Sequence, residues 1–277
     1  MNMPGEDWKQ TDAGGLSVYF HAEDALDAQV IAQACRDSLP LLQEEWGLAL
    51  ARGCRVYVMT DWREFIFNSA PPLRRLIYAL GYPLWARRMR AMWTYVGGWT
   101  VPYPGRPVVG VKPARLVAAS DRTIGQSIFV EQPDSQLKIR SLAAHELAHA
   151  AAAHLRLPAW LNEGLAMRTA DLALGRDTVR TDTLQLLKKP RRGPRAWLLM
   201  NTNLYFRGTD DIIYRYARGY WLTRYLQAVN SPALKAALRR RLPRRILYAR
   251  LAEAVGLTAG MFWKRIDRLV YDHFSGS

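Results

Sequence analysis

Two histidines and a glutamate, all within five residues, are the first group in the sequence that could do chemistry. The stretch "AAHELAHA" (143–150) places His145 and His149 four residues apart, with Glu146 directly after the first. On a helix, residues four apart project from one face about one turn apart, so the two imidazoles could bind one small ion. Glu146 would lie about 100° further round, where it can hold a water molecule but not serve as a third ligand. The pattern His-Glu-x-x-His thus predicts a zinc site with a general base.

A carboxylate that could complete this site follows in "PAWLNEGLA" (158–166). Pro158 would end the first helix, and a second helix directly after it would form a helical hairpin. Glu163, fourteen residues beyond His149, would lie one turn into the second helix and face back toward the histidines. Two histidines and one glutamate are a known catalytic zinc set that leaves a fourth position open for water. We therefore expect one Zn²⁺ per chain, bound by His145, His149 and Glu163.

The segments around these residues favour helix. From Asp134 to Leu157 the chain contains no Gly or Pro and is rich in alanine, and Asp134 or Ser135 can cap the helix N-terminus. A second helix is expected from Ala159 to Leu174, where Gly175 follows. The remaining histidine of the stretch, His154, is five residues past His149 and should point away from the site. We expect it at the surface or at the helix end.

The first half of the chain has the patterns of strands. Apolar, β-branched runs predict strands at 16–20, 54–60, 106–112 and 126–132, with a helix at 24–48 after the first. The last strand, "QSIFVEQ" (126–132), directly precedes the metal-binding helix. We expect it to form the edge of the substrate cleft, where an extended peptide could pair by main-chain hydrogen bonds. Strands followed by helices indicate an α+β fold, not a doubly wound sheet.

The second half reads as helical. Helices are expected from Asp211 onward, with breaks around 230–232 and at Pro243, and "KKPRRGPR" (188–195) is a basic loop. We expect two parts that form one catalytic unit. Residues 1–133 would be a β-rich subdomain, and residues 134–277 a helical subdomain that carries the zinc site.

The net charge of +15 is unevenly distributed. Residues 71–120 contain eight Lys and Arg and no acidic residue, and residues 186–250 contain 16 against two. The metal-binding segment between these blocks is nearly neutral, with seven basic and eight acidic residues in 121–185. Basic blocks of this kind suit a nucleic-acid backbone, an anionic membrane surface or an acidic partner, and charge alone does not choose among them.

One basic segment, 71–95, is also apolar and aromatic. Its longest uncharged stretch is far too short to span a bilayer, which needs about 20 apolar residues. We expect an amphipathic helix or hairpin that packs its apolar face on the core, with arginines extending to water. The alternative is a helix that lies on a membrane surface.

Together, "HELAHA" (145–150) and "WLNEGLA" (160–166) resemble the gluzincin metallopeptidases, which include thermolysin and the M1 family of aminopeptidases. The short spacing is most similar to the compact bacterial "peptidase MA-like" branch. "YARGYWLTRYL" (216–226) is similar to the Tyr-x-Lys-Gly segment of those aminopeptidases, with Arg218 in place of the lysine. The resemblance implies a zincin-like fold, and it implies that Tyr216 stabilises the oxyanion of the tetrahedral intermediate.

The sequence departs from the family in two places. The aspartate that follows the ligand glutamate by four residues in thermolysin-type enzymes is replaced here by Met167. Asp171 lies a further turn along, so we expect the support of the zinc histidines to come from Asn162 or from elsewhere. The Gly-x-Met-Glu-Asn segment that binds a substrate's free amine is absent. Aminopeptidase activity therefore does not follow from the resemblance.

These patterns predict a zinc-dependent hydrolase of peptides or proteins, with Glu146 as general base. The alternative is a basic nucleic-acid- or membrane-binding protein with a structural or vestigial zinc site. A retained Glu146 favours the enzyme, because a structural zinc needs no general base.

The two cysteines, Cys35 and Cys54, cannot form a disulfide framework and are expected to be buried apolar side chains. No secretory signal is visible, so we expect a cytoplasmic protein, with a peripheral position at the inner membrane surface as the alternative.

Overall fold

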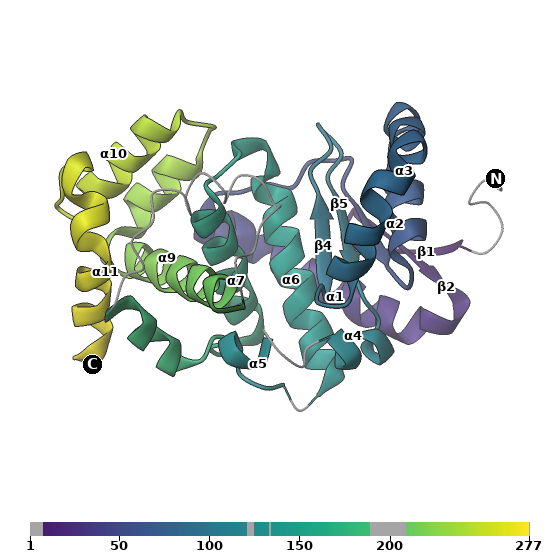
Figure 1. Ribbon diagram of the computed structural model, residues 1–277, viewed down its shortest axis with the longest axis horizontal. Helices are drawn as coiled ribbons and strands as arrows, with labels where there is room; N and C mark the ends of the chain where they lie inside the picture. The colour runs from purple at the N-terminus through teal and green to yellow at the C-terminus, as the bar shows by residue number, and fades with distance from the viewer. Residues whose placement is uncertain (1–7, 121–124, 133, 189–208, 277) are drawn as a thin grey trace.

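The computed structural model describes residues 8–120, 125–132, 134–188 and 209–276. Within these residues the chain has the expected α+β organisation, with one five-stranded mixed sheet and many helices. The sheet and its covering helices form one side of the molecule, and the helices of the second half of the chain form the other (Figure 1). The basic loop expected at 188–195 lies almost entirely outside the described residues.

The strands are β1 (Trp8–Asp12), β2 (Ser17–His21), β3 (Arg55–Val58), β4 (Gly98–Val101) and β5 (Val108–Val111). The helices before the metal-binding segment are η1 (Ala22–Asp24), α1 (Ala25–Trp46), α2 (Trp62–Ser69), α3 (Pro72–Trp93), α4 (Ala114–Ser120) and α5 (Gly125–Ile128). Those that follow are α6 (Ser135–Ala152), η2 (Ala153–Leu155), α7 (Ala159–Leu174), η3 (Thr181–Lys188), α9 (Thr209–Leu238), α10 (Arg244–Ala254) and α11 (Ala259–Ser275).

The sheet has the strand order β1-β2-β3-β5-β4. The three central strands, β2, β3 and β5, are parallel to one another. The edge strands β1 and β4 pair antiparallel with β2 and β5, respectively. Side chains alternate between the two faces along each strand. Val56 and Val58 of β3 pack in the large core that contains α1 and α6, and Tyr57 packs in a second, aromatic cluster with α2 and α3. The sheet is therefore covered by helices on both faces.

One expected strand is wrong. Residues 126–132 do not join the sheet: Gly125–Ile128 is a short helix, α5, and Phe129 makes an isolated bridge to Val179. A short apolar run is compatible with either a strand or a buried helical turn, and the chain adopts the turn here. The strand at the edge of the sheet nearest α6 is instead β4, which the sequence patterns did not predict.

The helices that carry the candidate metal ligands have nearly the bounds predicted from the sequence. Helix α6 begins after Asp134, whose carboxylate accepts a hydrogen bond from the backbone N–H of Gln136. Helix α7 has the expected bounds and ends at Gly175, which adopts φ = 63°, a conformation that glycine reaches without steric cost. Cys35 and Cys54 are buried as expected. No helix among the described residues is both long and apolar enough to cross a membrane.

The basic segment 71–95 is a single helix, α3, and not a hairpin. The expectation that its apolar side chains pack on the core is confirmed for the aromatic side chains but not for the leucines. Its aromatic side chains pack in the cluster on the α2 side of the sheet, but none of its residues is fully buried. Several of its leucines are exposed. At its C-terminus, the Lys112 ammonium donates a hydrogen bond to the Trp93 carbonyl and lies 4.1 Å from the centre of the Trp93 ring.

Candidate metal centre

The metal site predicted from the sequence lies where α6 and α7 pack together. These two helices share the most extensive contact in the described structure, and α6 also packs on β4 and β5. His145 and His149 project from α6, and Glu163 projects from α7 after the turn at Pro158. One ligand atom of each of the three residues lies within 4.8 Å of those of the other two. The structure thus brings all three expected ligands together.

The distances within this group fit a tetrahedral zinc ion. The two histidine Nε2 atoms are 3.1 Å apart, and Glu163 Oε2 lies 3.6 Å from His145 Nε2 and 3.5 Å from His149 Nε2. Ligand atoms about 2.0–2.1 Å from a tetrahedral zinc stand about 3.3 Å from one another, which these three distances bracket. Glu163 Oε2 is itself buried and lacks a hydrogen-bond partner, and such an orphaned acceptor is costly unless a cation occupies the space beside it.

The charges in the group support one another. Burial lowers the pKa of His149, but the neighbouring Glu163 carboxylate outweighs burial and raises that pKa to about 9. Burial raises the pKa of Glu163, and the two imidazoles overcome this effect and hold the pKa far below its usual range. Asn162 also lies beside His149 and contributes to its raised pKa, although His149 Nδ1 has no partner at ordinary hydrogen-bond distance. The raised pKa of His149 and the lowered pKa of Glu163 both reflect the attraction between these two side chains.

Glu146 is held apart from the ligand group by the edge strand β4. Its side chain is buried, and its Oε2 accepts a hydrogen bond of 2.7 Å from the Thr100 hydroxyl. On the same face of β4, a Cβ atom at Gly98 would lie 2.5 Å from Glu146 Cγ and 2.7 Å from Oε1. Glycine is therefore required at this position for Glu146 to occupy its place. Glu146 is close enough to His149 to raise the pKa of that histidine.

Tyr216 of α9 also reaches the site. Its side chain lies close enough to the Glu163 carboxylate for the two groups to interact electrostatically. The negative charge of Glu163, together with burial and the charge of Glu146, raises the pKa of Tyr216 well above its ordinary value. The phenol therefore stays protonated and can act as a donor. The residue expected from the family resemblance thus faces the candidate metal ligands.

Two glycines allow α7 and α9 to approach closely enough for this contact. A Cβ atom at Gly164 would lie 2.3 Å from the Gly219 carbonyl oxygen, and one at Gly219 would lie 2.5 Å from the Trp160 carbonyl oxygen. Gly164 follows the ligand Glu163, and Gly219 lies one turn after Tyr216. The close crossing of the two helices is therefore located at the residues that bring Tyr216 to Glu163. Arg218, in the position of the family's lysine, forms an ion pair with Asp267 of α11.

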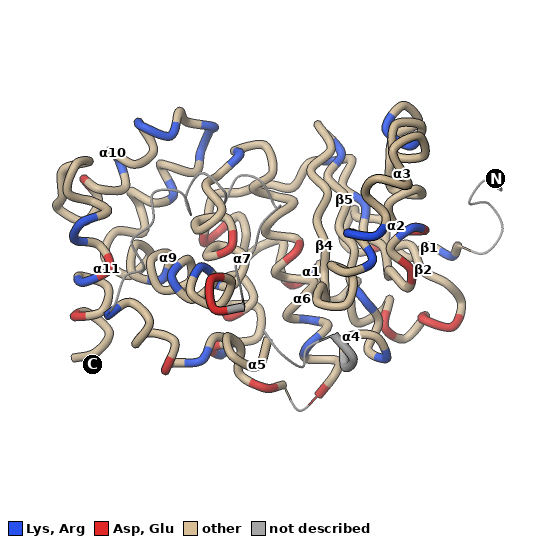
Figure 2. Tube along the Cα trace, in the orientation of Figure 1, with Lys and Arg blue, Asp and Glu red and all other residues tan. Residues whose placement is uncertain are grey.

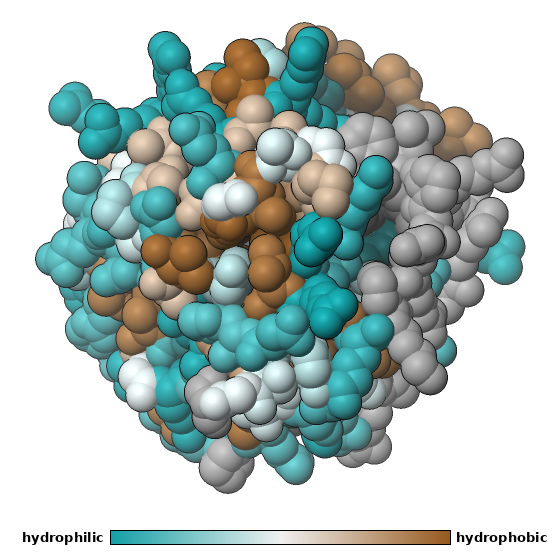
Figure 3. Space-filling view, turned by 90° about the vertical axis from the view of Figure 1, so that its left-hand side faces the viewer, coloured by the Kyte–Doolittle hydropathy of each residue, from teal (hydrophilic) through white to brown (hydrophobic). Residues whose placement is uncertain are grey.

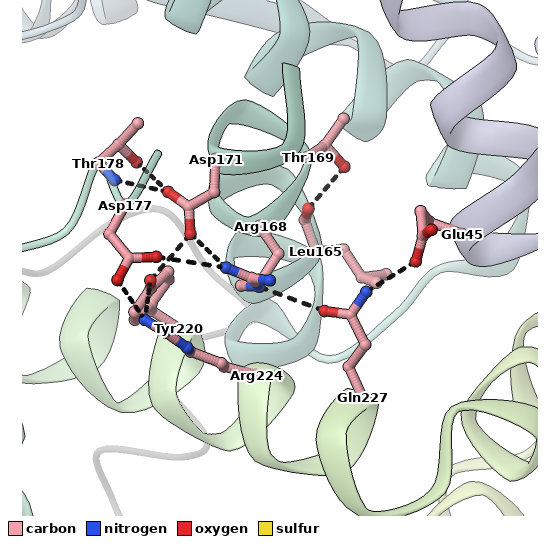
Figure 4. Close-up of polar contacts among 10 residues, drawn as sticks. All are labelled: Glu45, Leu165, Arg168, Thr169, Asp171, Asp177, Thr178, Tyr220, Arg224 and Gln227. Carbon is pink, nitrogen blue, oxygen red and sulfur yellow. Dashed lines mark hydrogen bonds and ion pairs between the residues drawn. The ribbon is translucent and has the colours of Figure 1, made fainter. Parts of the chain in front are cut away.

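The hydrogen bonds of Asp171 are made away from His145 and His149. This residue is buried at the junction of α7 and α9, where it accepts hydrogen bonds from Thr178, Arg168 and Tyr220 (Figure 4). The distance from the Tyr220 hydroxyl to Asp171 Oδ2 is 2.8 Å. This network fixes α9 against α7 one turn beyond Tyr216. Met167, at the family's aspartate position, is a buried core residue.

The other predicted and unpredicted residues are placed as follows. His154 is exposed at the end of α6, as expected, and its Nδ1 lies 3.0 Å from the Ala151 carbonyl oxygen. Gly98 and Thr100 were missed by the sequence patterns. They lie more than 40 residues before Glu146 in the chain, and no local spacing connects them to it. Only the antiparallel pairing of β4 with β5 brings them to α6.

Comparison with known proteins adds no assignment: no protein-family model matches the chain, and a search of curated proteins finds no match.

Proposed function

We propose that the chain is a zinc-dependent peptide hydrolase of the gluzincin type, with a zincin-like fold and Glu146 as its general base. The observation that carries the proposal is the position of Glu146. This carboxylate is not a member of the ligand group, yet it is buried beside that group by two residues of an edge strand. A site that merely held a structural metal would not need a second, separately positioned carboxylate.

The residues present fit a bound zinc ion. His145, His149 and Glu163 would hold it, leaving a fourth position for water. When bound, zinc supplies Lewis-acid chemistry, polarising a carbonyl group and lowering the pKa of a water molecule toward neutrality. Glu146 accepts a proton from the attacking water and passes it to the leaving amine. The Tyr216 hydroxyl donates a hydrogen bond to the substrate oxygen on which negative charge develops.

The edge strand β4 is the segment on which a substrate could align. Because β4 is the last strand of the sheet, one side of its backbone faces away from β5. An extended peptide could add to this side by main-chain hydrogen bonds and would then pass beside Glu146. The cleft edge that was expected at 126–132 is therefore proposed at Gly98–Val101.

The proposal is tested by separating metal binding from catalysis. Purified protein should contain about one zinc per chain, and His145→Ala, His149→Ala or Glu163→Ala should each remove it. Glu146→Gln keeps the size of the side chain but cannot accept a proton. We expect this variant to retain zinc while its turnover, measured with a proteome-derived peptide library, falls at least about a hundredfold. Folded native protein that binds no zinc, or a Glu146→Gln variant that loses its zinc, would contradict the proposal.

A further inference from the structure

Helix α3 carries a row of aliphatic side chains that the protein leaves exposed to solvent. Leu80 is 76% exposed and Leu84 is 91% exposed, and the same row begins two turns earlier. The exposed row consists of Leu73, Leu76, Ile77, Leu80 and Leu84. At 100° per residue these five positions span about 100° of the helix circumference, which makes one continuous apolar face.

The opposite face of α3 is the one that packs on the protein. Tyr78, Tyr82, Trp85, Met89 and Trp93 contact the aromatic cluster on the α2 side of the sheet. The centres of the two faces are about 160° apart. The helix thus has one aromatic face for the protein and one aliphatic face turned away from it. A surface helix that served only the fold would carry polar residues on the outer face.

Arginines border the exposed face. Arg74, Arg87 and Arg90 are exposed, and α3 contains no acidic residue. Figure 2 shows basic positions along α3 and no acidic ones. The absence of acidic residues extends from 71 to 120, so the sequence around the helix offers no carboxylate to neutralise these arginines.

The other end of the molecule differs. The face formed by α10 and α11 is largely hydrophilic, with apolar side chains exposed near its centre and in smaller groups elsewhere (Figure 3). On α10, Ile246 is exposed to 45%, but its arginines are not accompanied by a row of exposed leucines. The combination of an aliphatic row and flanking arginines is therefore a feature of α3.

We propose that α3 is a membrane-docking helix that lies in the plane of a bilayer carrying anionic lipids. The aliphatic row would enter the boundary between headgroups and acyl chains, and the arginines would contact acidic headgroups. A second copy of the chain would place these arginines opposite one another, which is unfavourable. A nucleic acid would engage the arginines but leave the leucines in water. Among these occupants only an anionic bilayer satisfies both sets of side chains.

Vesicle co-sedimentation tests the proposal with the full-length protein. We expect binding to phosphatidylcholine vesicles that contain about one third phosphatidylglycerol, weak binding to phosphatidylcholine alone, and a decrease with added salt. Leu80→Ser combined with Leu84→Ser should lower the partition coefficient about tenfold or more at constant charge. Leu26→Ser, at a leucine of α1 that is 75% exposed, is the control and should leave binding unchanged.

A second pair of variants tests the arginines at equal net charge. Replacing Arg74, Arg87 and Arg90 with Gln should lower binding on the order of a hundredfold at low salt. Replacing Arg240, Arg241 and Arg245, which are also exposed, removes the same charge and should have a much smaller effect. All these positions are exposed, so melting temperature and zinc content should stay unchanged in every variant, and failure here would leave the proposed hydrolase untouched.

Three outcomes would overturn membrane docking by α3. Equal losses in the two arginine variants would indicate adsorption by net charge. Unchanged binding of the double serine variant would exclude insertion of the aliphatic row. A concentration-dependent dimer that the double serine variant abolishes, without vesicle binding by the unaltered chain, would show that a second copy covers the helix.

Discussion

At the scale of single residues, the site depends on how Glu146 is kept out of the ligand group. Its carboxylate accepts a hydrogen bond from the Thr100 hydroxyl, and its side chain also packs against Gly98, which has no side chain to displace it. A glutamate that could swing freely would compete for the metal with Glu163 or move into water. The Thr100 bond and the space at Gly98 restrict Glu146 to the position from which, in the proposed mechanism, it would accept a proton without binding the ion.

Gly98→Ala tests this arrangement. The new Cβ would overlap Glu146 Cγ as well as its carboxylate, so the whole Glu146 side chain would have to rotate away from its place. We expect a folded protein that retains about one zinc per chain, while turnover falls as far as in Glu146→Gln, on the order of a hundredfold. Gly260→Ala is the control, because a Cβ there meets no atom within 4 Å. Normal turnover of the Gly98→Ala variant would show that Glu146 does not act from its observed place.

Tyr216→Phe tests the proposed oxyanion donor. The phenol acts only when charge develops on the carbonyl oxygen, so zinc content, melting temperature and substrate binding should be nearly unchanged. Single-turnover cleavage should slow by about 2–4 kcal/mol in activation free energy, the cost of one lost oxyanion donor. Tyr214→Phe, about 160° away round the helix, should cleave at the normal rate. If Tyr214→Phe were the slow variant, the alignment with the family's tyrosine would be wrong.

The sequence predicted that His145, His149 and Glu163 come together, but not which residues hold Glu146. His145 and His149 follow from helical spacing, and Glu163 follows from the proline turn between two helices; both rules are local. Thr100 and Gly98 reach α6 only through the pairing of β4 with β5. A four-residue strand that contains glycine has too weak a pattern to be predicted, so this contact could be found only in the structure.

At the scale of elements, the crossing of α7 and α9 determines where Tyr216 lies. Gly219→Ala should separate the helices, because the added Cβ meets a backbone carbonyl oxygen of Trp160 that cannot move alone. We expect a loss of about 1–3 kcal/mol in the free energy of unfolding, measured by urea denaturation. Turnover should fall further than in Gly260→Ala, whose stability should be unchanged. Equal stability of the two variants would mean that the close crossing is not required.

The elements that the sequence predicted well are those with strong local signals. Helix α7 is bounded by Pro158 and Gly175, and the break in α9 is at Asn230, where φ is −155° and ψ is 69°. The segment 126–132 was assigned wrongly because seven residues with an apolar centre suit a strand and a helical turn alike. For α3, composition predicted an amphipathic helix or hairpin but could not show that an aromatic face of it packs inward. That choice depends on the ring cluster around Trp62.

At the scale of the whole molecule, one large apolar core connects the sheet to the C-terminal helices. It contains Val56 of β3, Leu147 of α6, Leu165 of α7 and Val270 of α11. The two ligand-bearing helices lie in the middle of this core, and Trp46 of α1 donates a hydrogen bond of 2.9 Å to Thr169 of α7. Metal binding at the proposed site should therefore increase the free energy of unfolding of the whole molecule.

Zinc should consequently raise the stability of the entire chain in one transition. A ligand that binds only the folded state stabilises it by about 2.7 kcal/mol when its free concentration is 100 times its dissociation constant. We expect the melting temperature to rise steadily with buffered free zinc and to fall on addition of a chelator. His149→Ala should melt at a temperature that does not respond to zinc, because one ligand is missing. Two separate transitions, of which only one responds to zinc, would show that the α6–α7 region unfolds independently of the sheet. Calorimetry at several zinc concentrations distinguishes these cases. If the core is shared, a single unfolding transition should shift to higher temperature as the zinc concentration rises.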